Sequence, residues 1–261
     1  MQKAILITGC SSGIGLAAAK DLHQRGYRVL AACRKAEDVA AMEAMGMEGI
    51  TLDLDSAESV EQAARQVLAL TDGRLYALFN NGGFGLYGPL SQISREELER
   101  QFATNLFGTH QLTQLLLPAM LAQGEGRIIQ TSSIMGVVAT PGRGAYAASK
   151  YALEGWSDAL RMELRGSGVH VSLIEPGPIR SRFTHNVRQC DSAKPVTNPG
   201  IAARFTLTPE AVLPKLRHAL ESPRPRLRYP VTVIAHALSL LRRILPGRAL
   251  DRILSGHSTA R

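Results

Sequence analysis

The sequence contains few cysteines and no residue pattern typical of a metal site. Its 261 residues include three cysteines, Cys10, Cys33 and Cys190, which are too few and too scattered for a framework of disulfides. No Cys-x-x-Cys or His-x-x-x-His pair occurs, so we expect no metal ion. Redox chemistry in this protein would therefore require an organic cofactor.

The start of the chain lacks the pattern of a secretory signal. The apolar run after Met1-Gln2-Lys3 stops at Thr8-Gly9, so it has neither the length nor the cleavage region of a signal peptide. We therefore expect a cytoplasmic protein. A hydrophobic content of 45% allows a large core, and we expect one domain over residues 1–261.

Acidic residues are scarce at the C-terminal end of the chain. Between Ser222 and Arg261, eight arginines stand against one acid, Asp251, so this basic C-terminal extension holds +7 of the net charge of +8. The nearly neutral body argues against a nucleic-acid-binding protein. We expect a local basic surface instead.

Short apolar runs alternate with helical patterns along most of the chain. The alternation predicts an α/β fold, a doubly wound parallel sheet of Rossmann type, because parallel neighbours need crossover helices. The expected strands are Ala4–Ile7, Val29–Ala32, Gly49–Leu52, Tyr76–Phe79, Arg127–Thr131 and His170–Ile174. The expected helices are Leu16–Leu22, Glu37–Met45, Ser56–Leu70, a long stretch over residues 95–122, and Tyr146–Leu164.

The regular alternation ends after Glu175. Residues 176–208 are rich in proline, glycine and polar groups, which is typical of a loop near a substrate site. A helix should begin at Thr208-Pro209-Glu210, and Arg226–Val233 is a candidate last strand. We expect an amphipathic segment over Ile234–Leu245, within a C-terminal helical extension.

A glycine-rich loop over residues 8–15 joins the first predicted strand to the first helix. Its glycines allow a sharp turn, and the free N–H groups of a helix start stabilise the charge of a pyrophosphate. Such a loop alone is weak evidence, since an ordinary strand-to-helix turn can look the same, but its place in the first βαβ unit favours a dinucleotide site. The expected contacts are Gly9, Ser11, Ser12, Gly13, Ile14 and Gly15.

The end of the second predicted strand bears on which dinucleotide binds. An acid there would accept hydrogen bonds from the ribose of NAD, whereas this strand ends at Cys33-Arg34-Lys35, with cations suited to a 2′-phosphate. Arg34 therefore favours NADP, the alternative being that Arg34 and Lys35 are solvated loop charges. Asp53 at the end of the third strand either accepts from the adenine amine or caps the helix that opens near Ser56.

Tyr146 and Lys150 lie four residues apart in a helical stretch, so their side chains project from one face. A tyrosine has an ordinary pKa of about 10, which is too high for an efficient acid–base group at neutral pH. A neighbouring ammonium favours the phenolate and lowers that pKa. By itself, a Tyr-x-x-x-Lys pattern often occurs by chance and does not indicate a catalytic site.

In combination, these motifs resemble the short-chain dehydrogenase/reductase family over about residues 1–180. The matching residues are Thr8-Gly9, Gly13, Gly15, Asn80-Asn81-Gly82, Asn105, Ser133, Tyr146, Lys150 and Pro176-Gly177. The resemblance implies that Tyr146 transfers the proton, that Ser133 bonds the substrate oxygen, and that Lys150 lowers the tyrosine pKa and binds the nicotinamide ribose. It also implies that Asn105 holds a water of the proton relay.

The resemblance implies further cofactor contacts and an assembly. The additional cofactor residues are Asn80, Gly82, Pro176, Gly177 and Ile179, together with Tyr146 and Lys150, and the protein is expected to be a homodimer or homotetramer. The spacing to Tyr146 selects Ser133 over Ser132. Two departures stand out: Gly82 replaces the usual alanine and should loosen its loop slightly, and Ser12 stands where many NADP-binding members carry a basic residue.

The chain is more specifically similar to the branch that contains hydroxysteroid and retinol dehydrogenases, and over nearly its full length to an enterobacterial NADP-dependent aldehyde reductase of the family. Those members take apolar carbonyl compounds. Residues that could line an apolar pocket here, or alternatively pack in the core, are Phe84, Leu86, Met135, Val137, Val138 and Phe183. The competing functions are a 3-oxoacyl carrier-protein reductase and a non-enzymatic dinucleotide sensor.

An apolar stretch, Val231–Leu241, lies within the basic C-terminal extension. It is too short for a spanning helix, which needs about 20 residues. It could lie in the headgroup region of a membrane, with the arginines near an anionic surface. Alternatively, it covers the substrate site or packs at a subunit interface.

Overall fold

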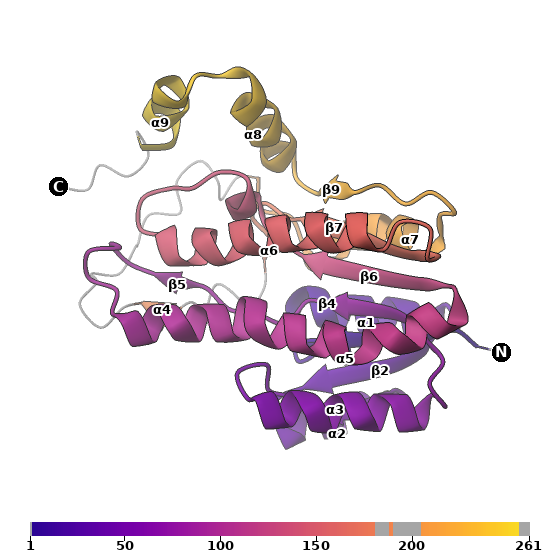
Figure 1. Ribbon diagram of the computed structural model, residues 1–261. Coiled ribbons are helices and arrows are strands. Elements are labelled where there is room, and N and C mark those ends of the chain that lie inside the picture. The colour runs from indigo at the N-terminus through magenta and orange to yellow at the C-terminus, as the bar shows by residue number, and fades with distance from the viewer. Residues whose placement is uncertain (1, 181–187, 190–204, 256–261) are drawn as a thin grey trace.

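Seven parallel strands form the central sheet of the computed structural model, which describes residues 2–180, 188–189 and 205–255 (Figure 1). The order is β3-β2-β1-β4-β6-β7-β9, so the winding direction reverses between β1 and β4. The strands are β1 (Ala4–Thr8), β2 (Arg28–Cys33), β3 (Glu48–Thr51), β4 (Leu75–Asn80), β6 (Gly126–Thr131), β7 (Val169–Glu175) and β9 (Arg228–Pro230). The predicted doubly wound sheet is confirmed, and the carboxyl ends of β1 and β4 mark the place where such sheets bind ligands.

Helices cover both faces of the sheet because its buried strands alternate their side chains between two cores. Ile5 and Ile7 of β1 join the core under α1 (Gly13–Gln24), α2 (Ala36–Glu43) and α7 (Leu213–Glu221). Leu6 joins the core under α3 (Ala57–Leu70) and α5 (Gly108–Gln123). The helix α6 (Gly144–Glu163) runs beside α5 on that second face (Figure 1).

The long helix expected over residues 95–122 is confirmed with one irregularity. The chain forms α4 (Arg95–Phe102), a π-helical turn η1 (Ala103–Phe107) and then α5. A capping box starts α4, since Ser94 accepts from the N–H of Glu97 and the Glu97 carboxylate accepts from the N–H of Ser94. π-helical turns are frequent at functional sites, and this one contains Asn105.

The last part of the chain leaves the sheet and returns over its carboxyl edge. The final strand, β9, is shorter than the predicted Arg226–Val233, because the Thr232 side chain accepts from the N–H of Ala235 and starts α8 (Val233–Ile244). The helix α9 (Gly247–Ser255) follows α8 beside the end of the sheet (Figure 1). Within the described part of the chain, no helix combines the length and the apolar character needed to cross a membrane.

One pair of strands was not expected from the sequence. The strand β5 (Leu86–Tyr87) pairs in parallel with β8 (Arg188–Gln189), which lies within the expected substrate loop 176–208. Most of that loop falls outside the described residues, as does Phe183.

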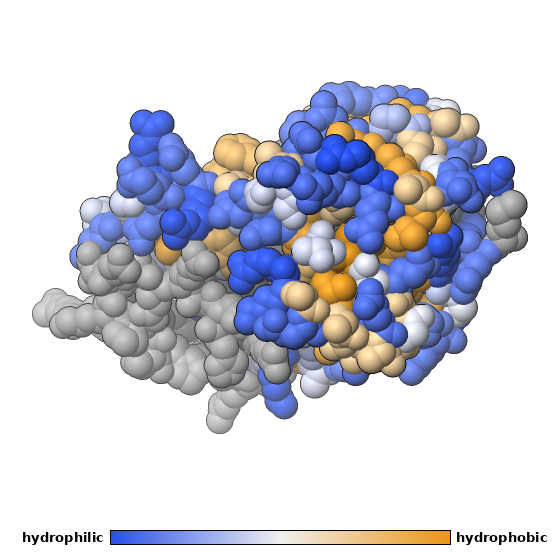
Figure 2. Space-filling view, turned by 90° about the horizontal axis from the view of Figure 1, so that it is seen from below, coloured by the Kyte–Doolittle hydropathy of each residue, from blue (hydrophilic) through white to orange (hydrophobic). Residues whose placement is uncertain are grey.

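Figure 2 views the molecule from below and shows hydrophilic side chains interspersed with smaller apolar areas on that face.

Candidate active site

The loop between β1 and α1 is locked to the end of β4 by Thr8. Its hydroxyl oxygen accepts from the N–H groups of Asn81 and Gly82, at 2.9 and 2.8 Å. Gly9 has a φ of +73°, and a Cβ at Gly15 would lie 2.2 Å from the carbonyl oxygen of Gly9. Gly9 therefore adopts a left-handed backbone conformation that disfavours other residues. At Gly15, the backbone of Gly9 comes so close that no side chain would fit.

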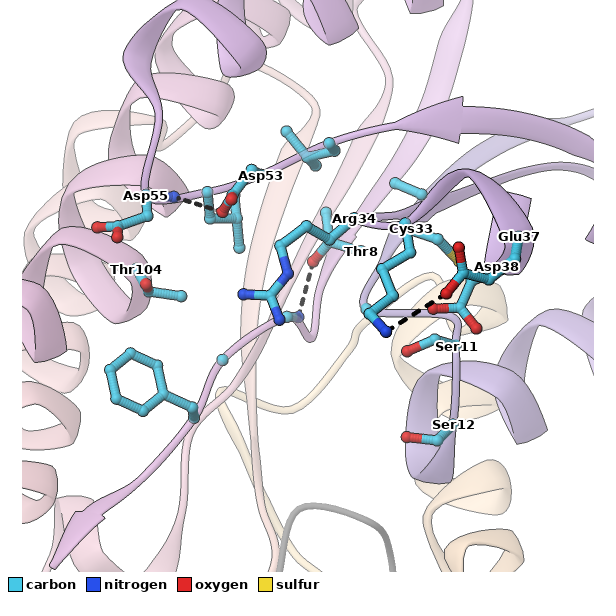
Figure 3. A pocket seen from close by; sticks show the side chains of 18 of the residues that line it. Thr8, Ser11, Ser12, Cys33, Arg34, Glu37, Asp38, Asp53, Asp55 and Thr104 are labelled. Atoms are coloured by element: carbon cyan, nitrogen blue, oxygen red, sulfur yellow. Dashed lines mark hydrogen bonds and ion pairs between the residues drawn. The ribbon is translucent and has the colours of Figure 1, made fainter. Parts of the chain in front are cut away.

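A cavity of about 710 Å³ opens beside this loop, at the carboxyl ends of the first four strands (Figure 3). Of the expected cofactor residues, Gly9, Ser11, Ser12, Arg34, Asp53 and Gly82 line it. The lining residues that were not expected include Glu37, Asp38 and Asp55, and also Arg100 on α4 and Thr104 on η1. Arg100 and Thr104 are four residues, about one helical turn, apart, which is a weak signal until the helix is placed over the cavity.

Arg34 and Lys35 differ in how their charges are used. The Lys35 ammonium lies 3.3 Å from a carboxylate oxygen of Glu37. Arg34 is exposed, and within the described residues its guanidinium makes no hydrogen bond or ion pair. Figure 3 shows the Arg34 side chain extending into the cavity. A free guanidinium at this place fits a phosphate group of a bound dinucleotide.

Asp53 lines the cavity and does not cap the following helix. Ser56 is the cap of α3, since its side chain accepts from the N–H of Ser59 at 3.2 Å. The Asp53 carboxylate instead accepts from the N–H of Asp55 at 3.1 Å. The alternative that Asp53 only caps α3 is therefore wrong, and its carboxylate remains beside the cavity.

The other expected cofactor residues surround the cavity less directly. Gly13, Ile14 and Gly15 form the first turn of α1, whose N-cap residue Ser12 makes no side-chain capping bond. The Asn80 side chain turns into the interior and donates to Thr113 Oγ1 at 3.1 Å, so Asn80 can offer a ligand only its backbone.

Pro176, Gly177 and Ile179 connect the end of β7 to the C-terminal elements. The Pro176 carbonyl oxygen accepts from the N–H of Ile134 at 2.9 Å. A Cβ at Gly177 would lie 2.1 Å from Thr232 Oγ1, so the first residue pair after β7 packs directly on the cap of α8. Ile179 forms an isolated parallel bridge with Leu207.

The four expected catalytic residues come from three separate segments and meet in the interior. Asn105 is 1% exposed, Ser133 8%, Tyr146 7% and Lys150 6%. The Lys150 Nζ lies 5.9 Å from the centre of the Tyr146 ring and donates to the Thr131 carbonyl oxygen at 2.8 Å. All four are thus buried and fixed by their neighbours.

The structure brings Ser133, and not Ser132, to the tyrosine. The Ser133 side chain forms a hydrogen bond with the Tyr146 phenol, and this bond lowers the pKa of the phenol. Ser132 faces the other way, because a Cβ built on Gly136 would touch both Ser132 Oγ, at 2.7 Å, and Glu154 Cγ, at 3.0 Å. This geometry agrees with the spacing argument that selected Ser133.

Asn105 uses both atoms of its side-chain amide within the protein. Its Oδ1 accepts from the N–H of Phe84 at 3.1 Å, and its Nδ2 donates to the Phe84 carbonyl oxygen at 3.0 Å and to Ser149 Oγ at 3.1 Å. Asn105 therefore joins the segment after β4 to α6.

Burial shifts the acid–base properties of both central residues. Lys150 was expected to lower the pKa of Tyr146, but burial raises the pKa of this phenol above its ordinary value. The neighbouring Tyr87 acts in the same direction, while Ser133 and Arg143 oppose the shift. Burial also lowers the pKa of Lys150 to about 8, against the opposing charge of Glu154. Glu154, whose negative charge raises the pKa of Lys150, was not identified from the sequence, although it lies one helical turn after Lys150.

The cavity and the expected catalytic residues adjoin at Gly83. A Cβ built on this cavity-lining glycine would lie 3.0 Å from Asn105 Oδ1 and 3.9 Å from Lys150 Nζ. At Gly82, where the sequence predicted a looser loop, a Cβ would lie 2.9 Å from Leu54 Cδ1. Leu54 thus occupies the space that the methyl group of an alanine would take, and the effect of Gly82 on the loop stays a prediction.

Three of the six expected apolar pocket residues gather beside Tyr146. Met135 and Val138 are buried with Tyr146 in one cluster, and Val137 packs against it. Leu86 is buried in β5, whereas Phe84 lines the cofactor cavity instead. The inner faces of α8 and α9 complete the cluster through Ala235 and Leu250.

Comparisons with known proteins agree with this geometry. A family model described as short chain dehydrogenase matches residues 3–192. The chain is 66% identical over 256 residues to the oxidoreductase YbbO of Escherichia coli strain K12, across 98% of this chain and 95% of that protein. It is 33% identical over 279 residues to retinol dehydrogenase 5 of Homo sapiens, across 96% of this chain and 87% of that protein.

Solved structures show the same architecture. A short-chain dehydrogenase from Streptomyces avermitilis matches with a TM-score of 0.82 at 29% identity, covering 92% of this chain and 91% of that chain. A metagenomic short-chain oxidoreductase in complex with NADP matches with a TM-score of 0.62 at 35% identity, covering 67% of this chain and 81% of that chain.

Proposed function

Because this chain belongs to the short-chain dehydrogenase family, we propose that it is an NADP-dependent oxidoreductase that reversibly reduces an apolar aldehyde or ketone to the alcohol. The observation that carries this proposal is the buried group of Asn105, Ser133, Tyr146 and Lys150, which adjoins the cavity at Gly83. These residues provide a proton donor, a hydrogen-bond donor for the substrate oxygen and a cation in one place.

Tyr146 gives the proton in the direction of reduction. Its raised pKa keeps the phenol protonated at neutral pH, so the proton is available when negative charge develops on the substrate oxygen. Ser133, which bonds Tyr146, is placed to donate to the same oxygen. When bound, the reduced nicotinamide supplies the hydride.

Lys150 acts on the tyrosine through its charge. Below a pH of about 8 it is an ammonium that stabilises the phenolate left after proton transfer. Its bond to the Thr131 carbonyl oxygen holds it beside the Tyr146 ring and leaves two further N–H donors for a ribose. Asn105, through its bonds to Phe84 and Ser149, positions the segments around the water of the proton relay.

Arg34 is the residue on which the preference for NADP rests. An unpaired guanidinium in the cavity binds a 2′-phosphate bidentately, and the same charge gives no advantage to NAD. Asp53 supplies a carboxylate for the adenine amine at the other side of the cavity.

An apolar substrate fits the surroundings of Tyr146. Met135, Val137 and Val138 lie in the cluster that contains the catalytic tyrosine, and α8 and α9 shield it. Retinol, named in the human relative, is an apolar alcohol. The proposal also keeps a cytoplasmic location and a homodimer or homotetramer.

An initial-rate screen tests the proposal directly. Apolar aldehydes, ketosteroids and 3-oxoacyl thioesters should be offered with NADPH and, in parallel, with NADH. We expect the highest kcat/KM for an apolar aldehyde or ketone with NADPH. A preference for 3-oxoacyl thioesters would assign the protein to carrier-protein substrates, and tight NADPH binding without turnover of any class would indicate a sensor.

A further inference from the structure

The helix α8 presents apolar side chains on two opposite faces. Its inner face packs Ala235, Leu238 and Leu241 into the cluster that contains Tyr146 and Met135. This packing fixes the orientation of the helix on the body of the protein. It also decides which residues remain on the outside.

The outer face carries a stripe of exposed aliphatic residues. Val233 is 74% exposed, Leu240 59% and Ile244 63%, and the exposed Ala237 lies between them. These positions follow the spacing i, i+4, i+7 and i+11, which places them on one side of a helix. We name Val233, Ala237, Leu240 and Ile244 the outer stripe. A helix that is apolar on both sides is ordinarily covered on both sides.

Arginines without partners surround the end of this stripe. Arg242 and Arg243 lie in the last turn of α8, and Arg248 and Arg252 lie on α9, against one acid, Asp251. In the described part of the chain, none of the four arginines makes a hydrogen bond or an ion pair. Arg243 lies close enough to Glu175 for its charge to oppose the rise that burial causes in the pKa of that carboxyl group.

We propose that the outer stripe and its arginines dock this protein on an anionic lipid surface. With 12 residues, α8 is about 18 Å long, which is far short of a bilayer core of about 30 Å. The helix therefore lies in the plane of the interface, with Val233, Leu240 and Ile244 among the upper acyl chains and the guanidinium groups on the lipid phosphates.

The distribution of charge favours a lipid surface over a second copy of the chain. In a twofold dimer the same patch meets itself, so the arginines around one outer stripe would face those around the other. Repulsion between them would oppose such a contact, because Asp251 is the one acid among residues 233–255. An anionic membrane supplies both the apolar phase and the counter-charge.

This docking does not depend on the proposed reaction, but it would have a consequence for it. The inner face of α8 covers the Tyr146 cluster, so a docked helix would hold the catalytic residues one helix diameter from the lipid phase. A substrate dissolved in the membrane would then be delivered close to the site.

Co-sedimentation of the full-length protein with vesicles tests the inference. The protein should pellet with phosphatidylcholine vesicles that contain phosphatidylglycerol, should pellet weakly with phosphatidylcholine alone, and should be released by high salt. Arg242→Gln with Arg248→Gln removes two cations and should weaken binding about 25-fold, at about five-fold for each. Leu240→Ser with Ile244→Ser should abolish stable binding.

Matched variants keep the outcome specific to this face. Met162 on α6 is 62% exposed, so Met162→Ser controls for loss of an exposed apolar side chain. Arg165→Gln with Arg224→Gln controls for the change in net charge. Both controls should pellet like the unchanged protein, and the melting temperature should confirm that every variant is folded.

Three outcomes would overturn the inference. One is failure of the unchanged protein to pellet with anionic vesicles at low salt. Another is binding that survives Leu240→Ser with Ile244→Ser, or that the control variants weaken equally. The third is dissociation of an oligomer by Leu240→Ser with Ile244→Ser, measured by sedimentation velocity, which would make the outer stripe a subunit interface.

Discussion

The candidate cofactor cavity and the proposed catalytic group of Asn105, Ser133, Tyr146 and Lys150 adjoin at one edge of the sheet but are built in opposite ways. The cavity holds exposed cations, such as Arg34, around open space. The proposed catalytic group is almost completely buried, with Tyr146 7% and Lys150 6% exposed, and hydrogen bonds hold the side chains of Asn105 and Lys150. Substitutions in the cavity should therefore change which ligand binds, whereas substitutions in the catalytic group should change turnover.

The largest expected effect is that of Tyr146→Phe, because it removes the proton donor and leaves the ring packing intact. The kcat should fall by about 10²- to 10⁴-fold. The dissociation constant for NADPH, measured by fluorescence titration, should barely change. Tyr151→Phe is the matched control, since Tyr151 lies on the same helix with its hydroxyl on the Val137 carbonyl oxygen. Retention of more than a tenth of the turnover in Tyr146→Phe would contradict the catalytic assignment.

Arg34→Asp tests the other side of the comparison. Loss of a charge-assisted bond to the 2′-phosphate should raise KM for NADPH about ten- to hundred-fold and leave KM for NADH much less affected. Lys35→Gln serves as control, because Lys35 is engaged with Glu37 and should matter less. Equal changes for both cofactors in Arg34→Asp would show that this residue does not contact the phosphate.

Gly82→Ala asks whether the border between the two regions is as tightly packed as Leu54 suggests. The added methyl must displace the end of the Leu54 side chain, so we expect a destabilisation of about 1 kcal/mol and a melting temperature about 2–4 °C lower. Combining it with Leu54→Val should recover most of the loss. A stabilised Gly82→Ala would show that open space exists there.

The smallest expected effect is a shift in the pH profile of Glu154→Gln. Lys150 is charged below its pKa of about 8, so the rate of reduction should fall as the pH rises through that value. The negative charge of Glu154 raises the pKa of Lys150. Removing that charge should therefore lower this pKa and move the alkaline limb of the kcat profile to lower pH.

Asp158→Asn is the control for that shift. Asp158 lies one turn further along α6 and also pairs with Arg228, so its loss perturbs the same ion pairs without removing the charge nearest Lys150. The limb should move less than in Glu154→Gln. An unchanged limb in Glu154→Gln would mean that Lys150 does not set it.

The fold and much of the candidate site could be predicted from local pattern. Apolar runs such as that in β1 and the helical spacing of Tyr146 and Lys150 depend on neighbours a few residues away, and the structure reproduces both. The glycines of the β1–α1 loop could likewise be identified, because a sharp turn limits which residues fit. Local pattern predicted a doubly wound parallel sheet, but it did not predict the order in which the seven strands lie side by side.

What the sequence by itself determined was therefore the alternation of strands and helices, the glycine loop and the order of the polar residues. Only the tertiary structure decided that Thr8 clamps Asn81 and Gly82, that Asn80 turns away from the cavity and that Glu154 stands behind Lys150. It also decided which side of α8 remains exposed. The physical reason is that these features depend on contacts between segments far apart in the chain, and local spacing carries no information about which distant residue fills a given space.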